Sequence, residues 1–184
     1  FDSTMVSGNA AAANTYTIIY NIMMAFYTAC STFMGQNWGA GHKKRMMDSY
    51  LISLFYAFAI AAVLGVAFYF AGRPFLYVFT NSADVVEAGM QRMKIMCFSY
   101  AISAFMDNTI AACRGLGRTI VPTMVVIMGS CVFRVIWVYT IFAHYHTIPS
   151  LYLLYAFSWT ITAAAEIVYF LHCFRKLRLV PETA

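Results

Sequence analysis

Residues Met46 to Ala71 read MMDSYLISLFYAFAIAAVLGVAFYFA and contain a single charged side chain, Asp48. A helix rises about 1.5 Å per residue, so a stretch of this length crosses a hydrocarbon core of about 30 Å. Largely apolar stretches of similar length occupy residues 10–34, 94–113, 119–142 and 150–174. The sequence therefore predicts an all-α fold, a polytopic bundle of five transmembrane helices.

The composition excludes a soluble helical bundle. Hydrophobic residues make up 62% of the 184 residues and charged residues 10%, against roughly one half and one quarter in a soluble domain. The net charge of +5 comes from short Lys and Arg clusters, not from a basic face of the kind that binds nucleic acid. We expect the lipid bilayer to be the main partner and expect no nucleic acid partner.

No soluble-enzyme motif is present, since the sequence lacks G-x-x-x-x-G-K, H-E-x-x-H and G-x-S-x-G. We therefore expect no enzyme and no cofactor, and an energy source other than ATP if the protein is a pump. The cysteines stand singly, without the paired spacing of a zinc or redox site, and we interpret them as packing residues. They are Cys30, Cys97, Cys113, Cys131 and Cys173.

Glycine and proline mark the predicted helix ends. The first span runs into Gly35-Gln36-Asn37-Trp38-Gly39-Ala40-Gly41, where three glycines and an Asn predict a helix stop and turn. The second span stops at Gly72-Arg73-Pro74, because proline cannot continue a helix. A short amphipathic stretch follows at 75–93, and Pro122 fits the first turn of the fourth span.

The basic residues alternate with the connectors, as the positive-inside rule requires of five spans. One side holds Lys43, Lys44, Arg45, Arg114, Arg118, Arg175, Lys176 and Arg178. The other side holds Arg73, Arg92 and Lys94, diluted by Asp84 and Glu87. This pattern predicts a multi-pass protein of the cell (inner) membrane with a cytoplasmic C-terminus. The N-terminus then begins outside, and since the chain starts at Phe1 without a signal peptide, we expect further spans upstream.

Three ionisable side chains fall well inside the spans: Asp107, Arg134 and Glu166. Each would cost several kcal/mol facing lipid, so each should face a helix interface or a wet cavity. Desolvation favours the protonated form of a carboxylate, which suits proton exchange near neutral pH, and its oxygens equally suit Na⁺. Asp107 and Glu166 are the ion-coupling candidates. The alternatives are a structural Asp107 satisfied by hydroxyls or Arg134, a structural or snorkelling Arg134, and a helix-packing or snorkelling Glu166.

A polar stripe follows one face of the first span, with helical spacing. Its members are Asn14, Thr17, Asn21, Thr28 and Ser31. It is either one wall of an aqueous substrate path or a set of interhelical hydrogen bonds. Tyr100 and Ser103 share the helix face of Asp107, so a cavity there would be aromatic and polar, which suits organic cations.

Gly35-Gln36-Asn37-Trp38-Gly39-Ala40-Gly41 resembles the G-Q-N-x-G-A-G turn of multidrug and toxic compound extrusion (MATE) transporters. The run from Gly8 to Asn14 resembles the start of that family's eighth helix, and Gly72-Arg73-Pro74 the end of its ninth. Asp107 with Arg114-Gly115-Leu116-Gly117 and Val121-Pro122 resembles the tenth and eleventh helices of bacterial members. The similarity covers nearly the whole chain in order.

This resemblance implies a two-lobe, twelve-helix transporter that exports drugs against inward H⁺ or Na⁺ movement. The chain, residues 1–184, would be helices eight to twelve, an incomplete six-helix C-terminal lobe. Its partners would be small organic substrates and the missing N-terminal lobe. Some members place the coupling Asp about one turn earlier, where this chain has Ser103, so the role assigned to Asp107 rests on a shared helix face. Asp107 is also the position for a possible Na⁺.

Two other functions fit the same residues. A flippase for a lipid-linked precursor has related architecture, and a wide basic cavity would mark it. Arg134 is the one Arg inside the spans, which argues against such a cavity. A non-transporting membrane scaffold is the third possibility, and Asp107 would then be replaceable without consequence. Secondary antiport of amphipathic, often cationic, compounds is the leading hypothesis.

Overall fold

The computed structural model describes residues 2–177 and is helical almost throughout, with no strand in that range. The long helices are α1 (Ser3–Gly39), α2 (Lys43–Phe70), α4 (Ala83–Gly115) and α8 (Ile148–Lys176). Between α2 and α4 lies the short helix α3 (Gly72–Tyr77). Arg178, one of the basic residues of the predicted cytoplasmic side, lies outside the described residues.

The segment between α4 and α8 is a continuous run of helical turns that alternates between α and π geometry. It consists of α5 (Ile120–Val126), η1 (Ile127–Val132), α6 (Phe133–Trp137), η2 (Val138–Phe142) and α7 (Ala143–Tyr145). Together with the four long helices it gives five helices long and apolar enough to cross a membrane. The five predicted spans are therefore confirmed.

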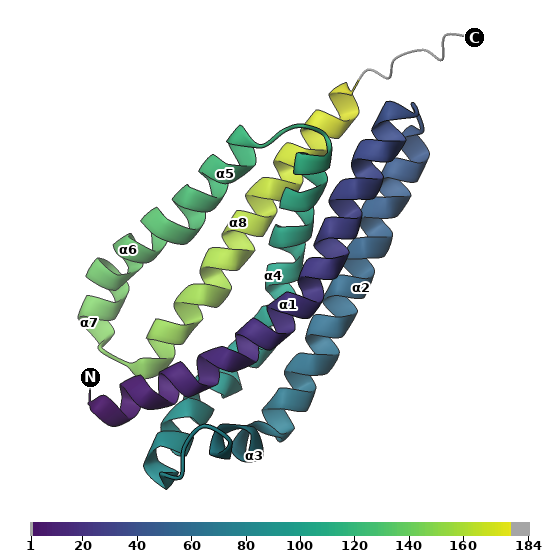
Figure 1. Ribbon diagram of the computed structural model, residues 1–184. Coiled ribbons are helices and arrows are strands. Elements are labelled where there is room, and N and C mark those ends of the chain that lie inside the picture. The colour runs from purple at the N-terminus through teal and green to yellow at the C-terminus, as the bar shows by residue number, and fades with distance from the viewer. Residues whose placement is uncertain (1, 178–184) are drawn as a thin grey trace.

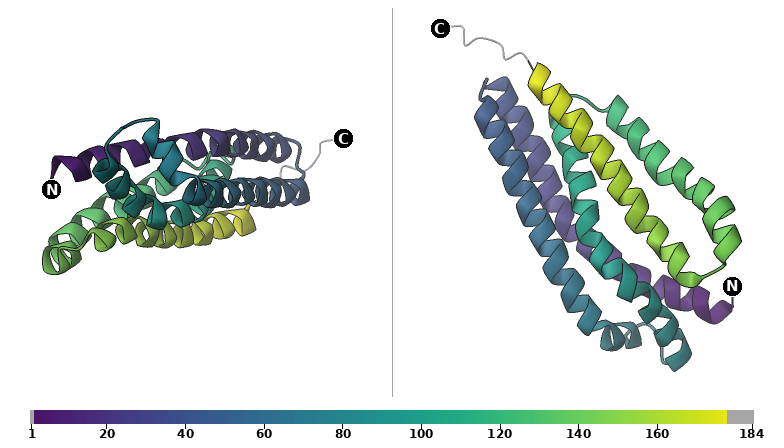
Figure 2. Two further views of the ribbon diagram at one scale, coloured as in Figure 1. Left: turned by 90° about the horizontal axis from the view of Figure 1, so that it is seen from below. Right: turned by 180° about the vertical axis from the view of Figure 1, so that it is seen from behind.

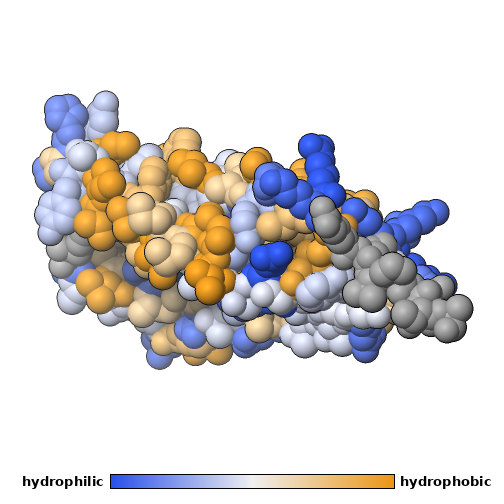
Figure 3. All heavy atoms as spheres, turned by 90° about the horizontal axis from the view of Figure 1, so that it is seen from above, coloured by the Kyte–Doolittle hydropathy of each residue, from blue (hydrophilic) through white to orange (hydrophobic). Residues whose placement is uncertain are grey.

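Helix α4 is the centre of the bundle and packs against α1, α2 and α8. It lies between the α1–α2 pair and α8, with the α5–α7 run on the outside (Figures 1 and 2). The outward faces carry large apolar side chains such as Phe55, Val63 and Val168. Hydrophobic residues also cover much of the surface in Figure 3, as expected of a protein whose solvent is lipid.

The connectors alternate between the two ends of the bundle. The α1–α2 turn, the α4–α5 loop and the end of α8 share one end, and the α2–α3 and α7–α8 connectors share the other (Figure 1). The basic clusters of the positive-inside pattern thus lie at a common end of the bundle.

Glycines let α4 approach its neighbours closely. A Cβ at Gly65 of α2 would run into the Cys97 carbonyl group, and a Cβ at Gly115 of α4 would lie 2.5 Å from the Ser31 carbonyl oxygen. Small residues at such crossings are how membrane helices gain van der Waals contact. Three cysteines, Cys30, Cys97 and Cys113, are buried in this packing, whereas Cys131 is exposed and Cys173 half-buried.

The helix ends within the predicted stop at residues 35–41, but α1 continues to Gly39, beyond the predicted end of the span at Met34. Gly35 lies in the helix beside Gly115, and Asn37 donates its side-chain amide to the Phe33 carbonyl at 2.8 Å within the same helix. Gln36 and Gly39 are helical as well. Only Gly41, with φ +73°, takes the left-handed conformation that ends the helix.

Gly41 and Gly117 close α1 and α4 in the same way. The amides of Gly41 and His42 donate to the carbonyls of Trp38 and Asn37 at 3.1 and 2.8 Å. At the end of α4, Gly117 has φ +68° and the amide of Arg118 donates to the Cys113 carbonyl at 2.9 Å. This double bonding around a left-handed glycine is the Schellman motif. Two helices thus stop at the same end of the bundle with the same capping motif.

The end of α2 and the start of α5 agree closely with the prediction, whereas α4 begins at Ala83, well before the predicted start of the third span at Lys94. Helix α2 ends at Phe70, just before Gly72–Pro74, and Pro122 lies in the first turn of α5. The stretch predicted as one amphipathic segment, 75–93, is divided between α3 and the first part of α4. Buried residues such as Val86 and Met93 pack this first part of α4 into the core. The helix therefore begins before the predicted span.

Candidate functional site

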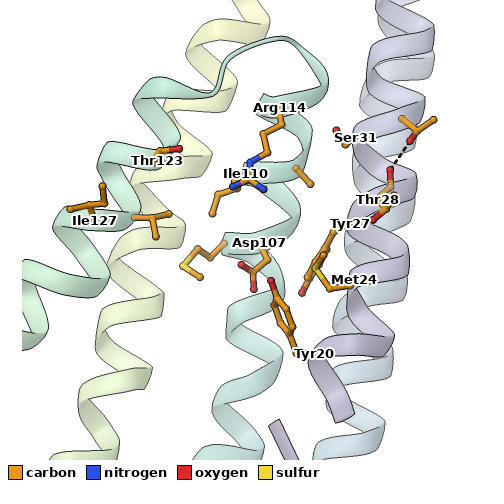
Figure 4. Close-up of a pocket in the computed structure, with 14 residues that line it drawn as sticks. Tyr20, Met24, Tyr27, Thr28, Ser31, Asp107, Ile110, Arg114, Thr123 and Ile127 are labelled. Carbon is orange, nitrogen blue, oxygen red and sulfur yellow. Dashed lines mark hydrogen bonds between the residues drawn. The ribbon is translucent and has the colours of Figure 1, made fainter. Parts of the chain in front are cut away.

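A cavity of about 440 Å³ lies between α1, α4 and the α5–η1 run. Helix α1 forms one wall and the last three turns of α4 form the back, while the start of α5 stands opposite (Figure 4). The lining is Tyr20, Met24, Tyr27, Thr28, Ser31, Thr32, Met106, Asp107, Ile110, Ala111, Arg114, Thr123, Val126 and Ile127. Aromatic, hydroxyl and apolar groups thus surround one acid and one base.

Asp107 is the acid of this cavity. It is half-buried, and its Oδ2 atom is buried without a hydrogen-bond partner among the residues that the structure describes. Tyr20 and Tyr27 of α1 lie beside it in Figure 4. A buried carboxylate oxygen that no protein group satisfies is available to a proton, a cation or water.

Arg114 is the base and lies on the same face of α4, two turns or about 10 Å along the helix. Within residues 2–177 the one salt bridge joins Arg73 to Glu87, so Arg114 and Asp107 are not paired with each other. The cavity therefore holds opposite charges at two levels.

The α1 wall contains part of the predicted polar stripe. Thr28 and Ser31 line the cavity, whereas Asn14, Thr17 and Asn21 do not. The amide of Asn14 donates to the Ala11 carbonyl at 3.2 Å within its own helix. Helix α1 bends along its length (Figure 1), and its N-terminal part, which carries Asn14, leads away from the cavity end of the bundle.

Tyr100 and Ser103 are buried and do not line the cavity. The Ser103 hydroxyl donates to the Tyr100 carbonyl at 2.8 Å. The Tyr100 ring contacts those of Tyr16 and Trp159, with centroids 5.2 and 6.3 Å away, and Tyr16 in turn contacts the lining residue Tyr20 at 5.5 Å. This aromatic cluster packs α1, α4 and α8 against one another on the N-terminal side of Asp107.

Arg134 lies outside the cavity, on α6. Its Nε donates to the Ser158 hydroxyl at 3.2 Å, and its guanidinium lies 4.4 Å from the centre of the Tyr155 ring. Arg134 makes no ion pair with Asp107. The alternative in which Arg134 satisfies a structural Asp107 is therefore wrong. Glu166, the second coupling candidate, also lies away from this cavity, fully buried on α8.

Sequence reasoning missed Tyr20, Met24 and Tyr27 as lining residues, and it used Arg114 for membrane topology and for the family resemblance but not as a lining residue. The three α1 residues share a helix face with Ser31, at spacings of four, three and four. Helical periodicity from Ser31 could have found them, but the chain has 13 Tyr and 16 Phe, so aromatic residues occur on every face.

A Na⁺ at this position would have oxygen ligands, the kind that a hard cation prefers. Asp107, Thr28, Ser31 and the hydroxyls of the two tyrosines supply oxygens to the cavity. In residues 2–177 no group of three or more His, Cys, Asp or Glu side chains is placed to hold a metal ion. One carboxylate with hydroxyls suits a proton or a monovalent cation better than a transition metal.

The family model MatE matches residues 1–140. "Protein DETOXIFICATION 8" of Arabidopsis thaliana is 26% identical over 98 residues, which are 53% of this chain and 20% of that protein. Among solved structures, a MATE in complex with MaL6 has a TM-score of 0.84 at 16% identity, covering 94% of this chain and 39% of that one. An outward-facing multidrug resistance MATE family transporter has a TM-score of 0.83 at 18% identity.

The match to this second structure covers 92% of this chain and 38% of that one. The chain therefore spans less than half the length of the relatives that it matches. At these identities the solved structures establish the fold, and the match over most of the chain establishes the family. From the family model and the shared fold together, the chain belongs to the MatE family.

Proposed function

We propose that this chain is part of a secondary antiporter that exports amphipathic, often cationic, organic compounds in exchange for H⁺ or Na⁺. The observation that carries the proposal is the Asp107 carboxylate, which faces a cavity inside a membrane span with one oxygen unpartnered. A carboxylate there can bind either a coupling cation or a cationic substrate, and such competition is how an antiporter couples the two.

The lining supports an amphipathic substrate. Tyr20 and Tyr27 offer ring faces to an organic cation, and Met24 and Ile110 offer apolar contact. Arg114 is the single base in the lining, so the cavity is not the broad basic surface that a lipid-linked phosphate precursor would need. The names of the relatives, a DETOXIFICATION protein and a multidrug resistance transporter, agree with this substrate class.

The arrangement in the membrane is also part of the proposal. The end of the bundle with the basic clusters is assigned to the cytoplasm, which puts the C-terminus on the cytoplasmic side of the cell (inner) membrane. The chain forms helices eight to twelve of a bacterial-type, twelve-helix transporter. An N-terminal lobe of the same protein supplies the opposite side of the substrate path.

The test is Asp107→Asn in the full-length transporter, with efflux of the fluorescent cation ethidium from cells as the readout. The substitution keeps the size of the side chain but removes the charge, so we expect at least a tenfold loss of efflux at equal protein in the membrane. Asp84→Asn, the same change at an exposed position of the same helix, is the control and should keep normal efflux. Normal efflux by Asp107→Asn would refute the assignment.

A further inference from the structure

A second cavity, of about 250 Å³, lies in a groove between α1 and α2. The two helices run side by side toward the end of the bundle that carries the basic clusters (Figures 1 and 2). The groove shares no lining residue with the Asp107 cavity, and helical spacing puts its α1 residues on the opposite face of that helix. The groove is therefore separate from the candidate transport site.

Small side chains form the floor of the groove, and their polar atoms are bonded inward. The Ser53 hydroxyl donates to the Asn108 side-chain oxygen at 2.9 Å, and the Cys30 thiol donates to the Asn108 carbonyl at 3.9 Å. Large apolar side chains border the groove, among them Phe33 and Ile52, which are 52% and 57% exposed. The groove thus presents an apolar surface outward.

The two ends of the groove differ in chemistry. At the inner end the rings of Phe26 and Tyr56 stack across the two helices, with centroids 6.0 Å apart and planes at 18°. At the other end the Ser49 hydroxyl donates to the carbonyl of Arg45, one turn before it, at 2.7 Å. Arg45, Ser49, Ile52 and Tyr56 are spaced four, three and four residues apart and share one face of α2. The groove therefore has an apolar inner end and a basic mouth.

The length of this face matches one leaflet of a bilayer. Arg45 and Tyr56 are eleven residues apart, which is about 16 Å along a helix. A hydrocarbon core is about 30 Å thick, so one leaflet contributes about half of that depth. A molecule in the groove would reach from the membrane surface to the middle of the bilayer, as one acyl chain does.

Charges at the mouth favour an anion. Lys44 and Arg45 are exposed, and neither forms a salt bridge within residues 2–177. Lys43 is turned toward α8, where its Nζ donates to the Leu177 carbonyl at 3.5 Å. Asp48 is the one acid in the sequence from 35 to 52, so basic groups outnumber acidic ones at this position. An anionic headgroup complements this charge, whereas a zwitterionic one carries no net charge to attract.

We propose that the groove binds an anionic phospholipid, with one acyl chain between α1 and α2 and the phosphate at the Arg45 guanidinium. A guanidinium and a phosphate form short, charge-assisted hydrogen bonds, often two in parallel. The acyl chain contacts the apolar borders at Phe33 and Ile52 and ends near the Phe26–Tyr56 pair. The inference goes beyond the antiport proposal and does not depend on it, because the groove and the Asp107 cavity share no residue.

The test is photocrosslinking in the full-length transporter, reconstituted in phosphatidylcholine vesicles. The probe is phosphatidylglycerol that carries a diazirine on one acyl chain. We expect crosslinks in the peptides that contain residues 26–33 and 49–56, and we expect excess unlabelled phosphatidylglycerol to suppress them. Phosphatidylcholine should not compete. No crosslink in these peptides would show that lipid does not occupy the groove, and equal competition by both lipids would refute the preference for an anion.

Arg45→Gln separates the role of the charge from that of the groove. The crosslink yield should fall about fivefold, as expected for the loss of one basic contact with an anionic lipid. Arg118→Gln, at an exposed basic position in the α4–α5 loop of the same end of the bundle, is the matched control and should keep the wild-type yield. Equal yields from the two variants would overturn the assignment of the phosphate to Arg45.

Ala29→Leu tests the groove itself by filling it with an apolar side chain. The yield should fall for the phosphatidylglycerol probe and also for a phosphatidylcholine probe of the same chain. Ala25→Leu adds the same group at an exposed position of α1 outside the groove and should change neither yield. Unchanged yields in Ala29→Leu would contradict an acyl chain in the groove. If Ala29→Leu fails to insert, the Arg45→Gln and Arg118→Gln pair decides alone, since both of these positions are exposed.

Discussion

Asp107 and Asn108 are neighbours in α4, yet they face opposite environments. The Asn108 amide accepts a hydrogen bond from Ser53 at 2.9 Å and donates to the Tyr50 carbonyl at 3.2 Å, so its polar atoms are bonded to α2. The Asp107 carboxylate faces the cavity with Oδ2 unpartnered. One side of α4 is a closed polar interface, and the other holds an acid that the protein leaves unsatisfied.

Burial also differs between α4 and the outer run. In the most apolar section of α4, 67% of the residues are buried. In the most apolar section of the outer run, Ile120–Tyr145, 0% of the residues are buried. Buried polar groups with complete hydrogen bonding fix the packing of helices, while an unsatisfied group needs a ligand. The comparison teaches that polarity alone does not mark the site. An unpartnered acid that also lines the cavity does.

The largest effect on stability should come from the close approach of α2 to α4. Gly65→Ala places a methyl group against the Cys97 backbone, where no flexible side chain can move away. We expect a loss of about 1–3 kcal/mol in the free energy of unfolding, as for overpacked cores. Gly39→Ala, where the added Cβ has no neighbour within 4 Å, should be neutral or slightly stabilising. Thermal unfolding in detergent measures both, and equal values would contradict the close packing.

Removing the Asn108 amide should open the closed side of α4. Asn108→Ala leaves the Ser53 hydroxyl and the Tyr50 carbonyl with fewer partners, at a cost of about 1–2 kcal/mol. Transport per inserted molecule should stay close to that of the wild type, since Asn108 does not face the cavity. Thermal unfolding together with an efflux assay checks both halves. Lost transport at unchanged stability would reverse the roles assigned to the two sides.

The smallest effect on stability should come from a Tyr→Phe substitution, made once on the closed side of α4 and once on the cavity side. Tyr50→Phe removes a hydroxyl that contacts Thr109 at 2.9 Å and should cost about 1 kcal/mol. Tyr27→Phe removes a buried cavity hydroxyl that has no hydrogen-bond partner within residues 2–177, and it should cost no stability. Its effect should appear in the substrate concentration for half-maximal efflux. Equal losses of stability in the two variants would remove the distinction between the sides.

Much of the fold follows from the sequence for simple reasons. Span length is set by bilayer thickness, so apolar stretches give the number of helices, and Pro74 gives one boundary. The end of α1 was harder to place, because Gly35 and Gly39 tolerate a helix and only Gly41 takes the left-handed conformation. Which of three glycines does so depends on Gly35 packing beside Gly115 of α4, and no local pattern contains that contact.

The candidate site was less predictable. Asp107 stands out in any sequence because a charge is rare inside a span, and its position in the cavity fits that expectation. The lining residues of α1, however, run only from Tyr20 to Thr32, so Thr28 lines the cavity and Asn14 does not. The contrast between Asp107 and Asn108 depends on which neighbour packs on each side of α4, and a single helix pattern carries no information about the neighbours.

The most direct test of the central claim is ion release from the purified full-length transporter. If Asp107 binds the coupling ion and substrate competes for it, adding ethidium should release H⁺ into a weakly buffered solution or displace bound radioactive Na⁺. We predict release from the wild type and from Asn108→Ala, and none from Asp107→Asn. Release from Asp107→Asn equal to that of the wild type would contradict the coupling role assigned to this carboxylate.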